Sequence, residues 1–489
     1  MQRIPDITNQ KMTRNVLDTE HVGRLLVKLA TPAFFGMFVQ TLYNVVNTIF
    51  IGHAQDTLGN PIGMKAIAGL SIVFPVQMLF MGVGMMVGMG GTSLISRFIG
   101  SGEKDKAEHT LGNGITCIII LGLLITVAIL PNINNFLRLI GASDDVLPYA
   151  REYLTIIVSA TVFNLIGMAL LNFVRAEGNA RVGMIANIIG AGLNIVLDAI
   201  FIFWLKMGVT GAAMGTVIAQ ITALIYLSTY YLSGSSYLKF HRSNLKLDPA
   251  ILKGMFSIGA SSFVQTVAGS ISAMLLMRQV VTHGGDIYLA AFGIIQRVMM
   301  FATMPAMVTG QGVQPILGFN YGARRFGLAL KALKIAMMAS TALSLVGFTV
   351  LYTIPGPIIK IFNTDPALVA AGIQASRLIF WSMPLMGLVM VGATSFMSIG
   401  KAKQAFILAL ARPVLFLIPA ALILPRLFGI EGVFVSFPTS DFFTLILTIA
   451  LIIPVIRQFR RAATEQAGQQ PSPVLVPNAL RSPGDSINK

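Results

Sequence analysis

The sequence predicts an all-α membrane protein with twelve transmembrane helices in two six-helix lobes related by a pseudo-twofold axis. The chain of 489 residues is 55% hydrophobic and only 11% charged, whereas soluble domains carry about 25% charged residues. Its mean hydropathy is +0.77. Twelve apolar stretches are each long enough to cross a bilayer, which takes about 20 residues. Motifs of the first half recur in the second half at a nearly constant spacing, which indicates an internal duplication.

The predicted spans are the apolar stretches between polar or glycine-rich connections. Some connections are very short, such as Lys206–Gly208, so neighbouring spans should form antiparallel hairpins. In chain order the spans cover residues 25–51, 66–95, 109–130, 150–173, 184–205, 209–232, 251–281, 287–310, 329–352, 370–393, 404–424 and 430–456. We expect a cytoplasmic N-terminal segment, a first lobe, a cytoplasmic linker, a second lobe and a disordered cytoplasmic tail rich in Pro, Gln and Ser. These are residues 1–24, 25–232, 233–250, 251–456 and 457–489, respectively.

The placement of the basic residues predicts the orientation of the chain. Of the 35 Lys and Arg residues, 25 fall on one side of the predicted spans and six on the other. Cytoplasmic loops carry the excess of Lys and Arg, so both termini should be cytoplasmic in a plasma (inner) membrane protein. The net charge of +16 is then a topology signal, and we expect no nucleic-acid partner. Cys117 is the only cysteine, which excludes an intrachain disulfide and thiolate metal clusters.

The internal repeat consists of four pairs of motifs in the same order. "FVQT" at residues 38–41 recurs at 263–266, and "GMGGTSLISRFIG" (88–100) matches "GQGVQPILGFNYG" (310–322). "EGNAR" at 177 matches "IGKAK" at 399, and "GVTGAA" at 208 matches "GIEGVF" at 429, so the four offsets are 225, 222, 222 and 221. Each half holds six spans, so the halves insert in the same orientation. Such repeats with a central site are typical of secondary transporters, and we expect the matched glycines to permit close helix packing.

Energy coupling would require a site inside the membrane, because the chain shows no P-loop motif for nucleotide binding. Only Asp198 and Asp441, of 19 acidic residues, lie well inside predicted spans. A carboxylate at that depth costs about 2.5–3.5 kcal/mol on insertion scales and suggests a function. Asn194 lies one turn before Asp198 on the same face. Thr216 and Asn47 should lie at the same level in the outer half of the first lobe.

These four polar side chains fit two kinds of coupling and one structural role. Carboxylate, amide and hydroxyl oxygens can bind Na⁺, with Asp198, Asn194 and Thr216 as the ligands. Alternatively, burial disfavours the charged form of a carboxyl group, so that Asp198 can carry a proton. In the structural alternative, hydrogen bonds to Asn194 and Thr216 merely hold Asp198 for helix packing. For Asp441 a functional and a structural role are equally open, and Arg297 or Arg377 could pair with it.

Several motifs resemble the multidrug and toxic compound extrusion (MATE) family, over roughly residues 20–456. They are "TLYNVVNTIFIG" after Pro32, "RAEGNAR", "NIVLDAIF" and "GAAMGT". "GQGVQPILGFNYGARR" is similar to the DinF-type branch of that family. The resemblance implies a cation-coupling site at Asp198, Asn194, Thr216 and Asn47. It also implies that Pro32 takes part in bending the first helix, and that Gln40, Tyr43 and Tyr153 line a substrate cavity, to which we add Asp441.

One position departs from the family pattern. Many relatives have an aspartate where this chain has Asn47, so the site keeps one carboxylate instead of two. Acids that other branches carry in the second lobe are also absent, because residues 251–281 and 370–393 contain no Asp or Glu. Coupling should therefore depend on Asp198, with either H⁺ or Na⁺ as the ion.

The predicted function is cation-coupled antiport, in which amphiphilic, often cationic drugs or toxic compounds are exported by alternating access. The alternative is a flippase for a lipid-linked saccharide, since such proteins share the wider fold. A passive channel would need a continuous polar pore, and an enzyme would need a paired catalytic constellation, so neither is favoured. We expect a monomer in contact with membrane lipid that binds a small amphiphilic substrate and needs no cofactor other than the coupling ion.

Overall fold

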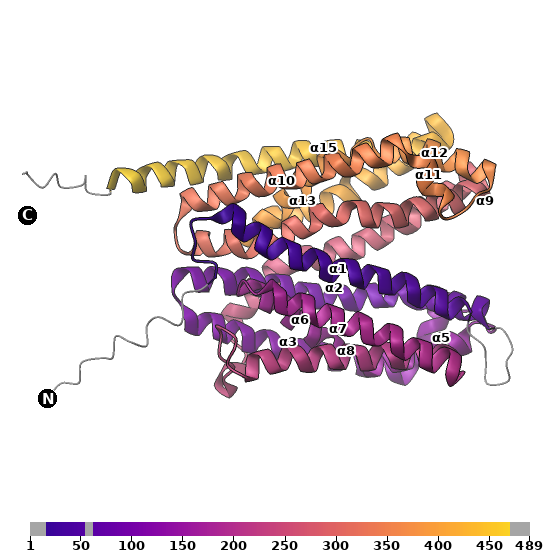
Figure 1. Ribbon diagram of the computed structural model, residues 1–489, viewed down its shortest axis with the longest axis horizontal. Helices are drawn as coiled ribbons and strands as arrows, with labels where there is room; N and C mark the ends of the chain where they lie inside the picture. Colours follow the sequence, from indigo (N-terminus) through magenta and orange to yellow (C-terminus); the bar gives the residue numbers. More distant parts are fainter. Residues whose placement is uncertain (1–15, 54–61, 470–489) are drawn as a thin grey trace, which may run out of the picture.

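The computed structural model describes residues 16–53 and 62–469, and every regular element in this part of the chain is helical. The helices run mostly along the long axis of the molecule (Figure 1). In chain order they are α1 (Val22–Gly52), α2 (Gly63–Ser101), α3 (Lys104–Ile129), η2 (Leu130–Asn132), α4 (Ile133–Leu139), α5 (Leu147–Ser159), α6 (Thr161–Ala176), α7 (Ala180–Asp198), η3 (Ala199–Trp204), α8 (Gly208–Leu232), η4 (Arg242–Leu245), α9 (Pro249–Gly322), α10 (Phe326–Thr353), α11 (Pro355–Lys360), α12 (Pro366–Phe380), α13 (Met383–Ser398), α14 (Ala402–Leu410), η5 (Ala411–Leu417) and α15 (Ile418–Gln469).

The prediction of twelve spans is confirmed. Eight stretches of helix in the described residues are long and apolar enough to cross a membrane. Two of them, α9 and the segment that includes α15, each contain a glycine with positive φ, Gly285 (68°) and Gly429 (59°), where one span ends and the next begins. Glycine permits this backbone at little cost. Two further spans are bent helix pairs, α5 with α6 and α12 with α13. The count is therefore twelve.

The predicted spans at 150–173 and 370–393 are each a pair of helices with a bend between them. The angles are 56° between α5 and α6 and 48° between α12 and α13. Pro384 in the first turn of α13 explains the second bend. At the first, the hydroxyls of Ser159 and Thr161 donate to carbonyl oxygens one turn earlier, a bonding pattern that bends helices.

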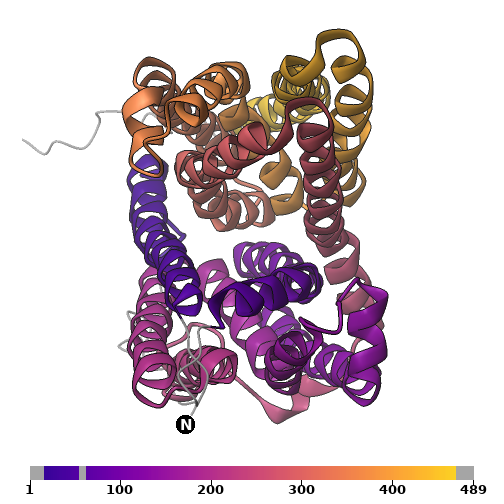
Figure 2. The same ribbon diagram turned by 90° about the vertical axis from the view of Figure 1, so that its right-hand side faces the viewer.

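The helices form two groups that follow the halves of the sequence, with α1–α8 in one group and α9–α15 in the other (Figure 2). The repeat also holds in the packing between these lobes. A Cβ added to Gly100 would lie 2.0 Å from the Phe319 carbonyl oxygen, and one added to Gly322 would lie 2.1 Å from that of Arg97. These two contacts are equivalent under an offset of 222 residues. These matched glycines thus permit close helix packing. So does Gly90, one of the glycines predicted to do so with Gly88, Gly310 and Gly312: its added Cβ would lie 2.1 Å from the Met255 carbonyl oxygen.

The close backbone approaches between the lobes lie in one half of α2. We call the end of the molecule at which α1 begins and α15 ends the basic end, because the loops there carry most of the Lys and Arg (Figure 1). The approaches extend along α2 from Met86, whose carbonyl oxygen faces Gly259, to Gly100 at the basic end. The Ser93 hydroxyl also donates to the Met397 carbonyl oxygen across the lobes. The lobes are therefore joined in the half of the molecule nearest the basic end.

The predicted disordered tail is wrong for its first part, because α15 continues to Gln469. Residues 457–469 are mainly Arg, Gln, Glu and Ala, which are good helix formers. Phe459 is fully buried and packs on the rings of Tyr321 and Phe326. Gln466 donates to the carbonyl oxygen of Arg324. Residues 1–15 of the predicted N-terminal segment and 470–489 of the predicted tail lie outside the described residues.

Candidate cation-coupling site

Asp198 is the last residue of α7, and its side chain is completely buried. The π-helix η3 follows directly, an irregularity often found at functional sites. α8 can approach the carboxylate because residue 215 is a glycine. A Cβ added to Gly215 would lie only 2.3 Å from Asp198 Oδ1. The "GAAMGT" segment therefore provides the space in which this carboxylate lies.

Asn194 and Thr216 contact the carboxylate from α7 and α8, as the sequence predicts. The amide of Asn194 is oriented so that both of its ends are satisfied: Nδ2 donates to Asp198 Oδ2 at 2.8 Å, and Oδ1 lies 3.2 Å from Thr216 Oγ1. Asn194 and Thr216 are 2% and 4% exposed. The three side chains form one hydrogen-bonded group between two helices.

Tyr43 connects this group to α1. Its hydroxyl interacts with the side chains of Thr216 and Asn47 and lies near the Asp198 carboxylate. Tyr153 on α5 is also near, since it interacts with Tyr43 and Asp198. The structure thus brings together the four predicted coupling residues and two of the predicted cavity residues.

Gln77 on α2 is a member of this cluster that sequence reasoning missed. Its Nε2 donates to the Tyr153 hydroxyl at 3.4 Å. It lies two residues after Pro75, in the middle of an apolar span, and its polarity at that depth was the signal that could have revealed it. Helices α1, α2, α5, α7 and α8 all contribute a side chain, so movement of any of them changes the cluster.

Two oxygen atoms in this cluster are buried without a hydrogen-bond partner among the described residues. They are Asp198 Oδ1 and Asn47 Oδ1. An unsatisfied buried polar atom costs about 1–3 kcal/mol, and more when it is charged. A proton on the carboxyl group would satisfy Asp198 Oδ1, and both atoms are of the oxygen type that ligates a hard cation. The cluster therefore offers a candidate position for an ion.

Gln40 and Pro32 lie on α1 outside this group. Gln40 is exposed, and no hydrogen bond joins it to the cluster in the described residues. Pro32 lies inside α1, which continues as one helix from Val22 to Gly52. Because proline has no backbone N–H, α1 lacks one helical hydrogen bond there. The roles of these two residues remain predictions.

Asp441 lies in the other lobe, within a separate network. Its side chain is 4% exposed, and Oδ1 accepts from Arg412 Nε at 2.6 Å. Oδ2 accepts from Ser382 Oγ at 2.6 Å, at the bend between α12 and α13. The suggestion that Arg297 or Arg377 pairs with Asp441 is wrong. The partner is Arg412 in the π-helical segment η5, a basic residue within an apolar stretch as Asp441 is an acidic one.

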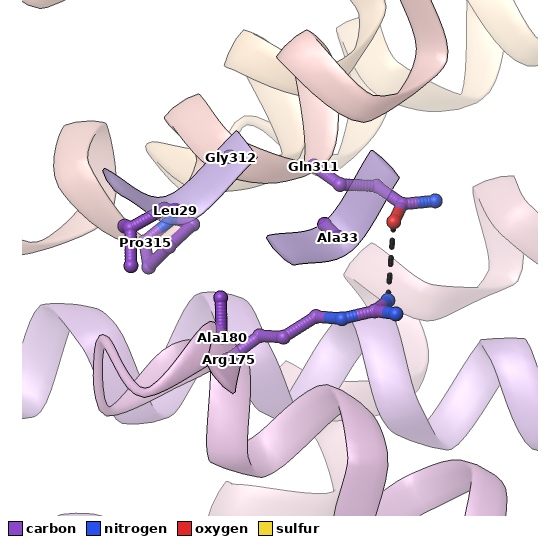
Figure 3. Close-up of a pocket in the computed structure, with 7 residues that line it drawn as sticks. All are labelled: Leu29, Ala33, Arg175, Ala180, Gln311, Gly312 and Pro315. Atoms are coloured by element: carbon purple, nitrogen blue, oxygen red, sulfur yellow. Dashed lines mark hydrogen bonds between the residues drawn. The ribbon is translucent and has the colours of Figure 1, made fainter. Parts of the chain in front are cut away.

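A small pocket lies between the lobes (Figure 3). Arg175 of α6 extends across it, and its Nη1 donates to Gln311 Oε1 of α9 at 3.1 Å. The sequence marks Arg175 only as a basic-end residue, whereas the structure makes it a hydrogen-bonded contact between lobes. The lining residues are Leu29, Ala33, Arg175, Ala180, Gln311, Gly312 and Pro315.

Comparisons with known proteins agree with these features. The MatE family model matches residues 32–200 and 260–423, one block in each lobe. The multidrug export protein MepA of Staphylococcus haemolyticus (strain JCSC1435) is 26% identical over 412 residues, which cover 84% of this chain and 89% of MepA.

Solved structures extend the likeness to the fold. The MATE multidrug transporter DinF-BH, solved in complex with a bound ligand, is 36% identical with a TM-score of 0.83 and covers 91% of this chain and 98% of its own. An outward-facing MATE family transporter of the MOP superfamily has a TM-score of 0.86 at 24% identity, over 92% and 100% of the two chains. It supports the fold alone. The chain belongs to the MatE family of multidrug export transporters, which are not enzymes.

Proposed function

We propose that this protein exports amphiphilic, often cationic compounds by antiport with H⁺ or Na⁺, and that the ion binds at Asp198. The observation that carries the proposal is the fully buried carboxylate with one unpartnered oxygen. The similarity to the multidrug transporter DinF-BH and to the multidrug export protein MepA supports the substrate class. The same similarity favours an exporter over a flippase for a lipid-linked saccharide.

Coupling requires that the ion bind one lobe arrangement more tightly than the other. The cluster offers a means, because its side chains come from five helices of the first lobe. When an ion or proton occupies Asp198, the Asp198 Oδ1 and Asn47 Oδ1 oxygens are satisfied and the cluster contracts around it. When the carboxylate is empty and charged, burial is costly, which favours an arrangement that admits water. The exchange between the occupied and the empty arrangement of the cluster moves α1 and α7 relative to the second lobe.

The orientation is also part of the proposal. Loops rich in Lys and Arg lie on the cytoplasmic side of membrane proteins, so we assign the basic end to the cytoplasm of a plasma (inner) membrane protein. The lobes are joined in that half, so this arrangement is the one in which the cytoplasmic path is closed. In it, the coupling site lies on the far side of the inter-lobe contacts.

Transport of ethidium, an amphiphilic cationic dye, into or out of proteoliposomes tests the coupling. A pH gradient and a Na⁺ gradient are imposed separately, and the initial rates of the parent protein identify the ion. Asp198→Asn should reduce the gradient-driven rate to that of empty liposomes. Asp286→Asn, which changes an exposed acid of α9, is the matched control and should transport normally. Full gradient-driven transport by Asp198→Asn would overturn the proposal.

A further inference from the structure

The linker between the lobes lies along the first lobe, where part of it is held by α3. Asn113 Nδ2 donates to the carbonyl oxygens of Asn244 and Lys246, at 3.3 and 3.0 Å, and its Oδ1 accepts from Asp248 N at 2.6 Å. A Cβ added to Gly112 would lie 2.3 Å from the Asn244 oxygen. This half of the linker is therefore packed against α3 rather than freely extended between the lobes.

Two carboxylates hold the preceding half of the linker through its backbone. Glu108 of α3 accepts from Lys239 N at 2.9 Å. Glu177, in the turn between α6 and α7, accepts from Ser236 Oγ at 2.6 Å and from Tyr237 N at 3.0 Å. Both carboxylates belong to the first lobe, so the linker is a strap fastened to that lobe before α9 begins at Pro249.

Glu177 differs from Glu108 in that it has no cationic partner in the described part of the chain. Glu108 pairs with Lys104 and His241. Glu177 is 4% exposed, and the titratable groups that face it are two tyrosines of α8, Tyr230 and Tyr231. A buried carboxylate without a counter-charge is costly in its ionised form.

Two buried atoms at this site complement each other. Glu177 Oε1 and the Tyr231 hydroxyl both lack a hydrogen-bond partner among the described residues. The Tyr231 hydroxyl can donate to Oε1 when Glu177 is ionised and can accept from an Oε1–H when it is protonated, while Oε2 continues to accept from the linker. Burial raises the pKa of Glu177 to about 7, although hydrogen bonds from Ser236, Tyr231 and the linker backbone act in the opposite direction. Protonation is favoured because the ionised group would be a buried charge without a cationic partner.

We propose that Glu177 is a proton-binding site at the basic end, and that its protonation fastens the inter-lobe linker to the first lobe. Ionisation of Glu177 loosens the strap at Ser236 and Tyr237, while Glu108 and Asn113 continue to hold the rest of the linker. The proposal is independent of ion binding at Asp198, since Glu177 lies outside the spans on the turn between α6 and α7. Such a site makes the attachment of the linker depend on pH at the basic end, where the two lobes are joined.

The direction of the effect follows from linkage. A released linker exposes Glu177 to water and returns its pKa to the ordinary value, 4.5, whereas the fastened state holds it at about 7. The fastened state therefore binds the proton more tightly, and attachment weakens as the pH rises between these two values. Between pH 6 and pH 8 the two pKa values predict a change of about tenfold in the opening equilibrium.

Hydrogen exchange of the full-length protein in nanodiscs, followed by mass spectrometry, measures the attachment directly. The readout is the protection of peptides covering residues 233–238, which Glu177 holds, corrected for the intrinsic pH dependence of exchange. The parent protein should lose about tenfold in protection between pH 6 and pH 8. Glu177→Gln, which keeps an acceptor and a donor without charge, should remain protected at both pH values. Glu177→Ala should be poorly protected at both.

Two further variants separate this site from others. Glu103→Gln removes an exposed carboxylate at the same end, which pairs with Lys106, and should retain the parent's pH response. Asp198→Asn should also retain it, even where transport is lost, so failure of the coupling proposal does not affect this result. Equal protection of the parent at pH 6 and pH 8, or loss of protection in Glu177→Gln to the level of Glu177→Ala, would overturn the proposal.

Discussion

Each lobe contains one buried aspartate within its spans, and the two are held in opposite ways. Asp198 of the first lobe receives a neutral amide hydrogen bond on Oδ2 and leaves Oδ1 without a partner in the described structure. Asp441 of the second lobe has both oxygens occupied, by the Arg412 guanidinium and by the Ser382 hydroxyl. One carboxylate can accept a cation or proton, and the other already has its counter-charge.

The comparison shows that a duplicated scaffold can carry unlike chemistry. Asp198 corresponds to Ala420 under the offset of 222 residues, and Asp441 corresponds to Gln220 under the offset of 221 that holds for the last matched motif. Backbone packing retains the symmetry, as the contacts of Gly100 and Gly322 show, whereas the charged positions do not. A buried ion pair contributes little net stability but is costly to break. We therefore interpret Asp441 as a structural element of the second lobe and Asp198 as the position that exchanges an ion.

The largest expected effect comes from neutralising the unpaired acid. Asp198→Asn should abolish gradient-driven transport while the thermal midpoint stays equal to that of the parent or rises, because a buried uncompensated carboxylate is removed. Asp441→Asn leaves Arg412 without its partner, so it should lower the thermal midpoint below that of the parent protein. Scanning fluorimetry and ethidium transport on both variants check this. Equal loss of transport in two equally stable variants would contradict the distinction between the two aspartates.

Arg412→Met tests the same distinction from the other side, because it leaves Asp441 as a buried and unpaired carboxylate. Removing one partner of a buried pair typically costs about 3 kcal/mol or more, so the thermal midpoint should fall clearly. The double variant Arg412→Met/Asp441→Asn retains an acceptor for Ser382 and removes both charges. It should recover most of the lost stability. A double variant as unstable as the single one would show that Arg412 acts through packing and not through its charge.

Gly215→Ala should affect transport more than stability. The added Cβ would lie 2.3 Å from Asp198 Oδ1, so the carboxylate must turn away from its position beside Asn194. Because the obstructing atom is the end of a side chain, we expect a stability cost of about 1 kcal/mol and a several-fold loss of transport. Gly192→Ala on α7 is the matched control, since nothing lies within 4 Å of its added Cβ. Equal transport by the two variants would contradict the importance of the Asp198 position.

The sequence predicts the features of the fold and of the site that depend on a local pattern of residues. Apolar length indicates the twelve spans, and the spacing of Asn194 and Asp198 on one helix indicates a shared face. Two other features depend on contacts between distant parts of the chain, so a local pattern does not predict them. The ion pair of Asp441 with Arg412 joins residues 29 positions apart on different spans. The α15 extension depends on Phe459 packing against Tyr321 and Phe326, which belong to distant helices.

The substitution that alters the structure least adds a second carboxylate to the site. Asn47 Oδ1 is buried and unpartnered in the described structure, and its side chain interacts with Tyr43, which itself lies near Asp198. Asn47→Asp keeps the size of the side chain and adds a negative charge, so a cation bound there gains a second charged ligand. We expect the Na⁺ concentration that half-saturates transport to fall by about tenfold, equivalent to 1.4 kcal/mol. Proteoliposome transport at a series of Na⁺ concentrations measures this, with Asn44→Asp on the exposed face of α1 as the control. Asn47→Asp could instead leave the Na⁺ dependence unchanged and alter only the response to a pH gradient. That outcome would indicate that the single carboxylate of the parent protein binds a proton. The difference between the lobes would then be one of protonation and not of sodium binding.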